Sequence, residues 1–381
     1  MKKSKIGAVI VAGGLSSRMK DFKPLLKIGN KTMIETTISN FTLAGVDEIV
    51  VVTGYRADDI EKKLACYNIN FVKNKNYEST HMFNSVCIGL KKISKKVDFV
   101  FISPSDSPFV QQFTLKRILD EMLITQNISL NLIQPSYEGK NGHPLLVRKE
   151  YVNIILEHDG ALGMQGAIAK MGVDYKNISF VDPGIILDAD VTDDYLKLIE
   201  YNENKNCPSL ELCKKIQDFF MMNDAVKAHS DKVAAVAINM CQHLFEKGIV
   251  LDKNIIMAAS MLHDIAKGST NHADVGAKWL LEMGYEEISK IVKEHMELSI
   301  ISNVVTEKEV VYLADKLVKD DTLVTIDQRF SFKEELYKND ITAAKAIEKR
   351  KIQTMNLYNM MFQIDYKVGN LTHIDSQEKK Y

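Results

Sequence analysis

Near its beginning the chain passes from an apolar run, residues 9–12, directly into Gly13-Gly14, two serines and Arg18. An apolar run that stops at glycines predicts a strand entering a tight loop, since glycine lets the backbone approach a ligand closely. Backbone N–H groups in such a loop, together with Arg18 and Lys23, suit the phosphates of a nucleoside triphosphate. No Gly-Lys-Ser/Thr follows, so this is not a Walker loop. Glycines alone more often mark an ordinary turn, and residues further along the chain decide between the two.

Up to about residue 200, short β-rich runs alternate with amphipathic helical ones. Alternation of this kind predicts an α/β domain with a mostly parallel sheet, whose ligands bind beyond the C-terminal ends of the strands. The expected helices include 32–43 and 114–123. The expected strands are 6–11, 48–53, 98–102, 130–134 and 144–147.

A polar stretch at 201–209 contains a proline and has no apolar period, so it is the expected linker between domains 1–200 and 210–381. Beyond it helical patterns dominate, and the second domain is expected to be all-α. The expected helices are 210–220, 232–245, 255–265, 274–283, 288–296, 307–319 and 339–363.

Composition favours a small-molecule enzyme over a nucleic-acid or membrane protein. The 381 residues, 46% of them hydrophobic, are enough for two cores. The 49 basic and 50 acidic side chains nearly cancel, and no dense basic stripe is present, which argues against nucleic acid as a partner. The five cysteines include no CxxC pair, as in a reduced, cytoplasmic protein. No apolar stretch approaches membrane-spanning length.

Two acidic segments accompany the glycine loop. Asp106 follows the expected strand 98–102, where a carboxylate can hold Mg²⁺ against phosphate oxygens. The pair Asp188 and Asp190 offers a further carboxylate late in the domain. Nucleotidyl transfer mainly requires positioning of the reactants and neutralisation of charge, so these groups suffice without a covalent nucleophile.

With Gly142-His143-Pro144 and Ser85 added, these segments resemble the MobA-like NTP transferases, most closely the molybdenum cofactor cytidylyltransferases. The resemblance covers the first domain and implies a Rossmann-like nucleotidyltransferase fold. It further implies catalytic roles for Arg18, Lys23 and Asp106, and transfer from an NTP to a molybdopterin-type phosphate. Its implied Mg²⁺ ligands are Asp106 and Asp190, with Asp188 second to Asp190. The implied nucleotide-binding residues are Ala12, Gly13, Gly14, Arg18, Lys23 and Ser85.

Nucleotide and acceptor remain open at this point. Ala12-Gly13-Gly14 is shared with guanylyl-transferring relatives, whereas the Gly-His-Pro segment leans towards the cytidylyl branch, so CTP is expected ahead of GTP. Because one fold serves many acceptors, a sugar or alcohol phosphate is the alternative to molybdopterin. Molybdoenzymes or other proteins of the cofactor pathway are possible partners.

A second constellation of imidazoles and carboxylates lies beyond the linker. A lone histidine is usually structural, but six such groups in this order favour a site for Mn, Fe or a similar divalent ion. An aspartate among them can bridge two ions. The six residues are His229, His263, Asp264, His272, His295 and Asp315.

This order resembles the HD-domain phosphohydrolases over about residues 210–330. The resemblance implies a first metal on His229, His263, Asp264 and Asp315. His272 and His295 would add a second, bridged by Asp264, and Lys267 would reach a substrate phosphate. A regulatory HD module without turnover is the alternative. Arg329 and Arg350 are expected on solvated helix faces, with phosphate contact as the second interpretation.

Overall fold

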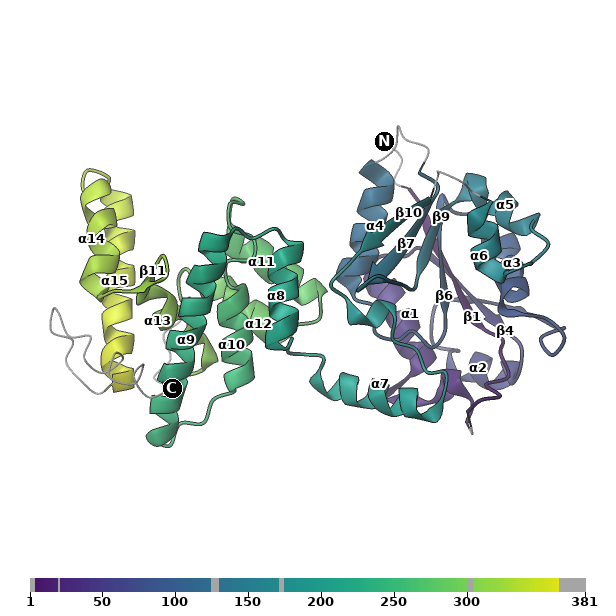
Figure 1. The fold of residues 1–381 in the computed structure, drawn as a ribbon, viewed down its shortest axis with the longest axis horizontal. Helices are drawn as coiled ribbons and strands as arrows, with labels where there is room; N and C mark the ends of the chain where they lie inside the picture. The colour runs from purple at the N-terminus through teal and green to yellow at the C-terminus, as the bar shows by residue number, and fades with distance from the viewer. Residues whose placement is uncertain (1–3, 20, 125–129, 171–174, 300–303, 363–381) are drawn as a thin grey trace. The chain divides into compact units, whose positions relative to one another are not determined.

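The computed structural model describes residues 4–19, 21–124, 130–170, 175–299 and 304–362 (Figure 1). The chain divides into two compact units, Met1–Asn204 and Lys205–Tyr381. This division lies within the stretch expected to be a linker. Helix α7 (Thr192–Asn204) continues through the first four residues of that stretch. The end of the second domain, 363–381, lies outside the described residues.

The first unit is built on a mixed but mainly parallel sheet in the order β10-β7-β9-β6-β1-β4-β5, with β8 paired to β7. Strand β9 runs antiparallel to both β6 and β7, and the other neighbours on this path are parallel. The predicted mostly parallel α/β fold is therefore confirmed. The strands are β1 (Ile6–Ala12), β4 (Glu48–Thr53), β5 (Asn70–Lys73), β6 (Phe99–Pro104), β7 (Leu132–Tyr137), β8 (Lys140–Asn141), β9 (Leu145–Arg148) and β10 (Tyr175–Ser179).

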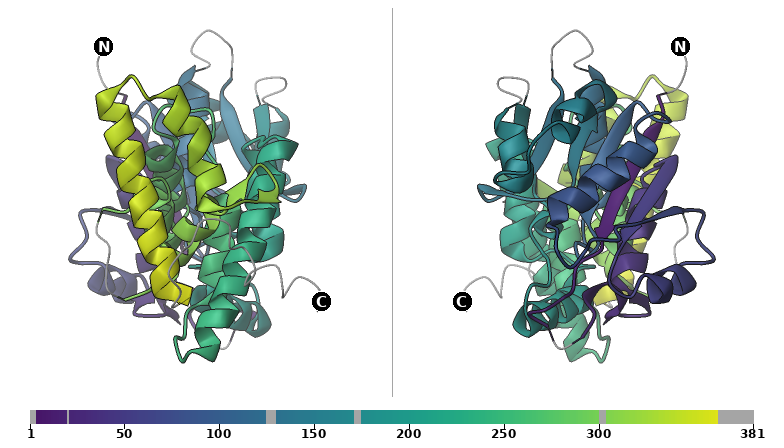
Figure 2. Two further views of the ribbon diagram at one scale, coloured as in Figure 1. Left: turned by 90° about the vertical axis from the view of Figure 1, so that its left-hand side faces the viewer. Right: turned by 90° about the vertical axis from the view of Figure 1, so that its right-hand side faces the viewer.

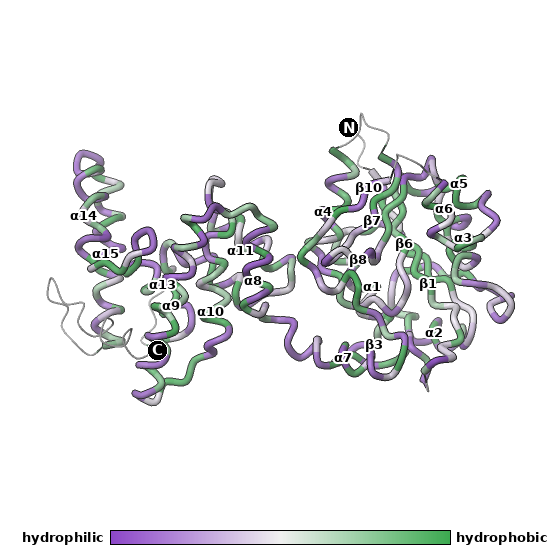
Figure 3. Tube along the Cα trace, in the orientation of Figure 1, coloured by the Kyte–Doolittle hydropathy of each residue, from purple (hydrophilic) through white to green (hydrophobic). Residues whose placement is uncertain are grey.

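The centre of the sheet is apolar along its length, as the colouring of β1 and β6 shows (Figure 3). Every residue of β1 is buried, since helices cover both faces of a parallel sheet. Ala12 pairs with Thr53 of β4, and Val11 pairs with Pro104 of β6, so the C-terminal ends of these strands lie side by side. In the sheet, β4 lies on one side of β1 and β6 lies on the other side. A ligand site is expected where the strand order reverses in this way.

Helices α1 and α4 pack on one face of the sheet, and α3, α5 and α6 on the other (Figure 1). Gly89 of α3 permits close packing, because a Cβ there would lie 2.4 Å from the Cγ1 of Val9. The helices are α1 (Met33–Leu43), α2 (Ala57–Lys63), α3 (Met82–Ile93), α4 (Gln112–Ile124), α5 (Val152–Leu156) and α6 (Gly163–Ala169). The shorter elements of the described residues include the hairpin of β2 (Lys27–Ile28) and β3 (Lys31–Thr32), and 3₁₀ turns at Lys23–Leu25, Lys149–Tyr151 and Pro183–Ile185.

The described part of the second unit is helical, as predicted, apart from a small hairpin. Helices α9, α10, α12 and α13 pack together, and α14 lies against α15 (Figure 2). Helix α14 was not predicted, because only Ile326 and Phe330 are buried along it and its other apolar residues follow no helical period. No helix in the described part of the chain is long and apolar enough to cross a membrane. The helices are α8 (Leu210–Phe219), α9 (Asp224–Glu246), α10 (Lys253–Leu262), α11 (His272–Glu282), α12 (Glu286–Glu294), α13 (Glu307–Lys316), α14 (Ile326–Leu336) and α15 (Ile341–Phe362), and the hairpin joins β11 (Val318–Lys319) to β12 (Thr322–Leu323).

Helix α7 belongs to the core of the first unit, which predicts where the chain can be cut. Leu198 is fully buried, and the ring of Tyr201 lies 4.9 Å from that of Phe109. We therefore expect a fragment of residues 1–204 to unfold in one cooperative transition. A fragment of residues 1–190 should be less stable by at least the ~2–5 kcal/mol that loss of one buried leucine costs. Circular-dichroism melting tests this, and equal stability of the two fragments would contradict it.

Candidate active sites

The glycine loop follows directly from the end of β1 and is open to ligand. Gly13 packs against the end of β4 and near Ser85, whereas a Cβ on Gly14 would meet nothing within 4 Å. Ser16 adopts a left-handed conformation with φ of 52°. Its hydroxyl accepts a hydrogen bond from the backbone N–H of Lys23 at 3.2 Å. This bond closes the loop and fixes the start of the 3₁₀ turn that carries Lys23.

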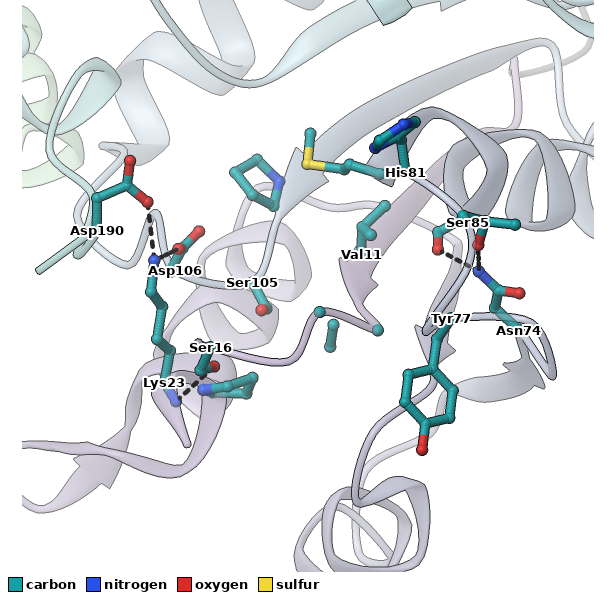
Figure 4. Close-up of a pocket in the computed structure, with 17 residues that line it drawn as sticks. Val11, Ser16, Lys23, Asn74, Tyr77, His81, Ser85, Ser105, Asp106 and Asp190 are labelled. Atoms are coloured by element: carbon teal, nitrogen blue, oxygen red, sulfur yellow. Dashed lines mark hydrogen bonds and ion pairs between the residues drawn. The ribbon is translucent and has the colours of Figure 1, made fainter. Parts of the chain in front are cut away.

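Lys23 lies at the meeting point of three segments that are far apart in the sequence (Figure 4). Its ammonium Nζ lies 2.8 Å from Oδ1 of Asp190 and 3.6 Å from Oδ2 of Asp106. Asp106 follows β6, and Asp190 comes just before α7. The lysine side chain is 14% exposed, so its charge acts in a largely dry environment.

Three carboxylates crowd around this lysine. Burial raises the pKa of Asp106, although the charge of Lys23 opposes the shift. Burial, together with the charges of Asp106 and Asp190, raises the pKa of Asp188 to about 6. The carboxylates around Lys23 therefore carry more negative charge than this one lysine balances, and Asp190 has a further contact to the exposed Arg18. A surplus of carboxylate oxygens is the donor chemistry that suits Mg²⁺.

These groups form one wall of a pocket of about 250 Å³. On the opposite side the Asn74 amide donates to the hydroxyl of Ser85 at 3.0 Å, and Tyr77 and His81 lie next to them (Figure 4). Of the residues predicted for this site, those that line the pocket are Ala12, Gly13, Gly14, Lys23, Ser85, Asp106 and Asp190.

Arg18 is placed differently from the other predicted residues. It does not line the pocket. Its side chain is 73% exposed, and one guanidinium nitrogen lies 3.5 Å from Asp190. Arg18 therefore lies at the rim of the site, where it contacts Asp190.

Asn74, Tyr77 and Thr80 line the pocket but were missed from the sequence. They follow β5, a short edge strand of four residues, none of them fully buried, which gives no apolar run to detect. The polar edge strand β10 was missed for the same reason. The one available signal was Asn74 itself, a residue favoured in turns, after a β-rich segment.

In the second unit, five helices and their ends bring the six predicted residues together. His229 lies within α9 and Asp315 within α13. His263 caps the end of α10 and is followed by Asp264. His272 begins α11, and His295 caps the end of α12.

Asp264 is common to two groups of potential metal ligands. Ligand atoms of His229, His263 and Asp264 all lie within 4.8 Å of one another, and the same holds for Asp264, His272 and His295. Asp315 adds a carboxylate to the first group, since its Oδ1 lies 3.1 Å from Nε2 of His229. This arrangement matches a pair of adjacent ion sites that share one aspartate.

Three of the four imidazoles are oriented by backbone carbonyls. The Nδ1 atoms of His229, His263 and His295 lie 2.7, 2.7 and 2.6 Å from carbonyl oxygens of Asp320, Ser260 and Val292, respectively. An Nδ1–H that donates to a carbonyl leaves Nε2 free as a metal ligand. Nε2 of His263 is buried and has no hydrogen-bond partner among the described residues. A missing ligand, such as a metal ion, explains this atom.

The charge states also suit metal binding. Burial lowers the pKa of His263 to about 4, so the imidazole is neutral near pH 7. Burial alone would raise the pKa of Asp264, but His263, the hydrogen bonds from His272 and His295, and the charge of Lys267 together hold it well below its usual range. A neutral imidazole beside an ionised carboxylate is the state in which both bind metal.

Cationic side chains surround this centre. Lys267 lies 2.5 Å from Asp264, and its half-exposed side chain also reaches solvent. Lys316, which had no assigned role, is buried 2.6 Å from Asp315. Arg329 and Arg350, expected on solvated helix faces with phosphate contact as the second interpretation, lie on α14 and α15. Both are only partly exposed and line a pocket with Lys316.

Two family models match separate parts of the chain. Residues 8–175 match the MobA-like NTP transferase domain, and residues 226–320 match the HD domain. The molybdenum cofactor cytidylyltransferase of Escherichia coli is 28% identical over 194 residues, which cover 51% of this chain and 95% of that protein.

Two further known proteins are similar to part of the chain. The bifunctional protein GlmU of Staphylococcus haemolyticus is 24% identical over 168 residues, covering 43% of this chain and 36% of the relative, so the chain spans about a third of its length. A nucleotidyl transferase from Methanothermobacter thermautotroptrophicus has a TM-score of 0.46 and 23% identity, over 53% of this chain and 99% of that one.

Proposed function

We propose that this chain, which joins a MobA-like NTP transferase domain to an HD domain, is a bifunctional enzyme. The first domain would transfer a cytidylyl group from CTP to a molybdopterin-type phosphate and release pyrophosphate. The second would hydrolyse phosphate esters at a centre that binds one or two transition-metal ions, Mn or Fe. The proposed transferase activity rests on the convergence of Lys23, Asp106 and Asp190. The proposed hydrolase activity rests on the position of Asp264, which belongs to two groups of potential metal ligands.

In the transferase, backbone N–H groups of the glycine loop would hold the triphosphate while Lys23 offsets the charge that builds up on the departing pyrophosphate. Asp106 and Asp190 would hold Mg²⁺, which would neutralise phosphate oxygens when bound. The acceptor phosphate supplies the attacking oxygen, so the protein contributes alignment rather than a nucleophile. Ser85 and Asn74 would bind the nucleotide from the opposite wall of the pocket.

The choice of CTP and of a molybdopterin acceptor rests on the Gly142-His143-Pro144 segment and on the similarity to the E. coli cytidylyltransferase. Incubation of the protein with each of the four NTPs, Mg²⁺ and molybdenum cofactor, followed by mass spectrometry, tests both. We expect a cytidylylated product. A GTP-derived product would show that GTP, not CTP, is the nucleotide substrate. Product formed only with a sugar or alcohol phosphate would show that the acceptor is not molybdopterin.

In the HD domain, Lys267 would bind a substrate phosphate next to Asp264. Metal ions held by the two groups would supply a water nucleophile and polarise the phosphoryl oxygen when bound. Assays of the Mn²⁺- and Fe²⁺-loaded protein with nucleotides, dinucleoside polyphosphates and cyclic nucleotides test this activity. Bound metal without turnover of any phosphate ester would favour a regulatory module instead.

The different burial of Lys23 and Arg18 predicts different costs of removing them. Lys23→Ala should lower kcat/KM for the NTP by about tenfold to a hundredfold, the usual cost of losing a charged hydrogen bond. Arg18→Ala should have a smaller effect, because its charge is exposed and screened. Lys62→Ala, an exposed lysine of α2, is the matched control. Wild-type kinetics for Lys23→Ala would contradict the assignment.

A further inference from the structure

A small pocket of about 40 Å³ lies beside the HD centre, with walls formed mainly by basic side chains. Its volume is large enough for a few water molecules or one compact anion. Apolar groups from Met296, Phe330 and Ile347 complete the walls and limit access of water. The basic residues come from three elements and are Lys316, Arg329, Lys333 and Arg350.

Two of these residues connect the pocket directly to the candidate metal ligands. The Lys316 ammonium donates to Asp315 at 2.6 Å and to the carbonyl oxygen of His295 at 2.9 Å. Arg329 lies 3.7 Å from the same aspartate. The pocket therefore begins where the metal-ligand cluster ends.

Positive charge in the pocket exceeds the negative charge that faces it. Asp315 is the shared counter-ion of Lys316 and Arg329, and it is also an expected metal ligand. Glu297 lies 3.1 Å from Arg350 but is shared with Lys349, on the outer side.

Among the basic side chains of this pocket, Lys333 has the fewest negative charges close to it. Its ammonium has no salt bridge within 4.0 Å among the described residues, and the acidic residues Asp327 and Glu334 of the same helix pair with Lys351 instead. Burial, followed by the charges of Arg329, Lys316 and Arg350, lowers its pKa. Basic groups held together around a cavity are costly unless an anion joins them, so this cluster is built for an anionic ligand.

We propose that this pocket binds a second phosphate group of the HD-domain substrate. The substrate would then carry at least two phosphate groups, as in a nucleoside diphosphate or bisphosphate. One group would lie at the metal-ligand cluster for hydrolysis, and the other would lie among Lys316, Arg329, Lys333 and Arg350. This inference rests on the proposed hydrolase activity and narrows its substrate class. Guanidinium groups suit a phosphate because they donate two parallel hydrogen bonds.

Binding of inorganic pyrophosphate to the full-length, metal-free protein tests the pocket without requiring turnover. The measurement uses a Lys23→Ala background, which weakens binding at the transferase site, and isothermal titration calorimetry. Adding Lys333→Gln should weaken pyrophosphate binding about tenfold to a hundredfold. Lys345→Gln removes an exposed lysine of α15 and should leave the affinity unchanged. Equal affinity for the two variants would overturn the proposal.

Hydrolysis kinetics then test the substrate class. In the otherwise wild-type chain, Lys333→Gln and Arg350→Gln should each lower kcat/KM for a nucleoside diphosphate or bisphosphate about tenfold or more, with little effect on a nucleoside monophosphate. An equal loss for all three substrates would point to a disturbed metal centre and contradict a second phosphate site. If no substrate is hydrolysed, the proposed hydrolase fails, while the pyrophosphate titration still decides whether the pocket binds phosphate.

Discussion

Replacing Asp106 with asparagine is expected to lower the rate of nucleotidyl transfer by about a hundredfold to a thousandfold. The substitution keeps the shape of the side chain and removes the negative charge that faces Lys23 and that we propose binds Mg²⁺. Lys23 lies 3.6 Å from the Asp106 carboxylate, so the variant also loses part of the electrostatic attraction that positions the lysine ammonium. Single-turnover measurement of pyrophosphate release at saturating NTP and Mg²⁺ gives the rate directly.

The same substitution should not destabilise the protein. Burial raises the pKa of Asp106, so the folded state disfavours its ionised form. Because the pKa is raised, the protonated carboxyl stabilises the folded state at a pH below the ordinary pKa of aspartate. This stabilisation is lost as the pH rises through the pKa of the folded state. At pH 7 the metal-free Asp106→Asn variant should therefore melt at the wild-type temperature or slightly above it.

An exposed aspartate of α4, Asp120, provides the control. Asp120→Asn removes the same charge from the same unit and should change neither rate nor melting temperature. If Asp106→Asn loses activity together with several degrees of melting temperature, the carboxylate is structural. If it retains wild-type transfer, the metal role is excluded.

The sequence was most informative where apolar strands are fully buried. Strands β1, β4 and β6 were predicted nearly to the residue because continuous apolar runs identify strands buried on both faces. The ends of these runs placed the glycine loop and Asp106 at one edge of the sheet. The opposite wall of the pocket was not predictable in this way, since Asn74 and Tyr77 follow a half-exposed edge strand.

For the HD centre, sequence order and structure agree on which residues converge. All six predicted imidazoles and carboxylates meet. Their order along the chain and the resemblance to the HD domain identified them, whereas the helical pattern did not, since His229 lies in α9 outside the helix expected at 232–245. The basic pocket beside them was not predicted. Its residues Arg329 and Lys333 lie on α14, whose weak apolar period hid the helix itself. Basic side chains on an unrecognised helix resemble an ordinary solvated surface.

The shared position of Asp264 predicts that a single substitution empties both metal positions. Asp264→Asn retains the size of the side chain but removes the carboxylate that lies 3.5 Å from His263 and 3.2 Å from His272. We expect the wild-type protein, loaded with Mn²⁺ or Fe²⁺ and dialysed, to hold one to two equivalents in this domain. The variant should lose most of this metal, and hydrolysis should fall by a hundredfold or more.

A second substitution distinguishes a shared ligand from a general disturbance of the centre. His272→Gln changes only the group formed by Asp264, His272 and His295, so it should remove at most one equivalent of metal and leave the other. Asp274→Asn, an exposed carboxylate of α11, should leave metal content unchanged. Metal content by inductively coupled plasma mass spectrometry separates the three variants. Because Asp264 lies in the other domain, the proposed nucleotidyl transfer should continue in all of them. Full metal content in Asp264→Asn would exclude the bridging role, and hydrolysis by a metal-free Asp264→Asn protein would exclude the metal centre as the catalyst.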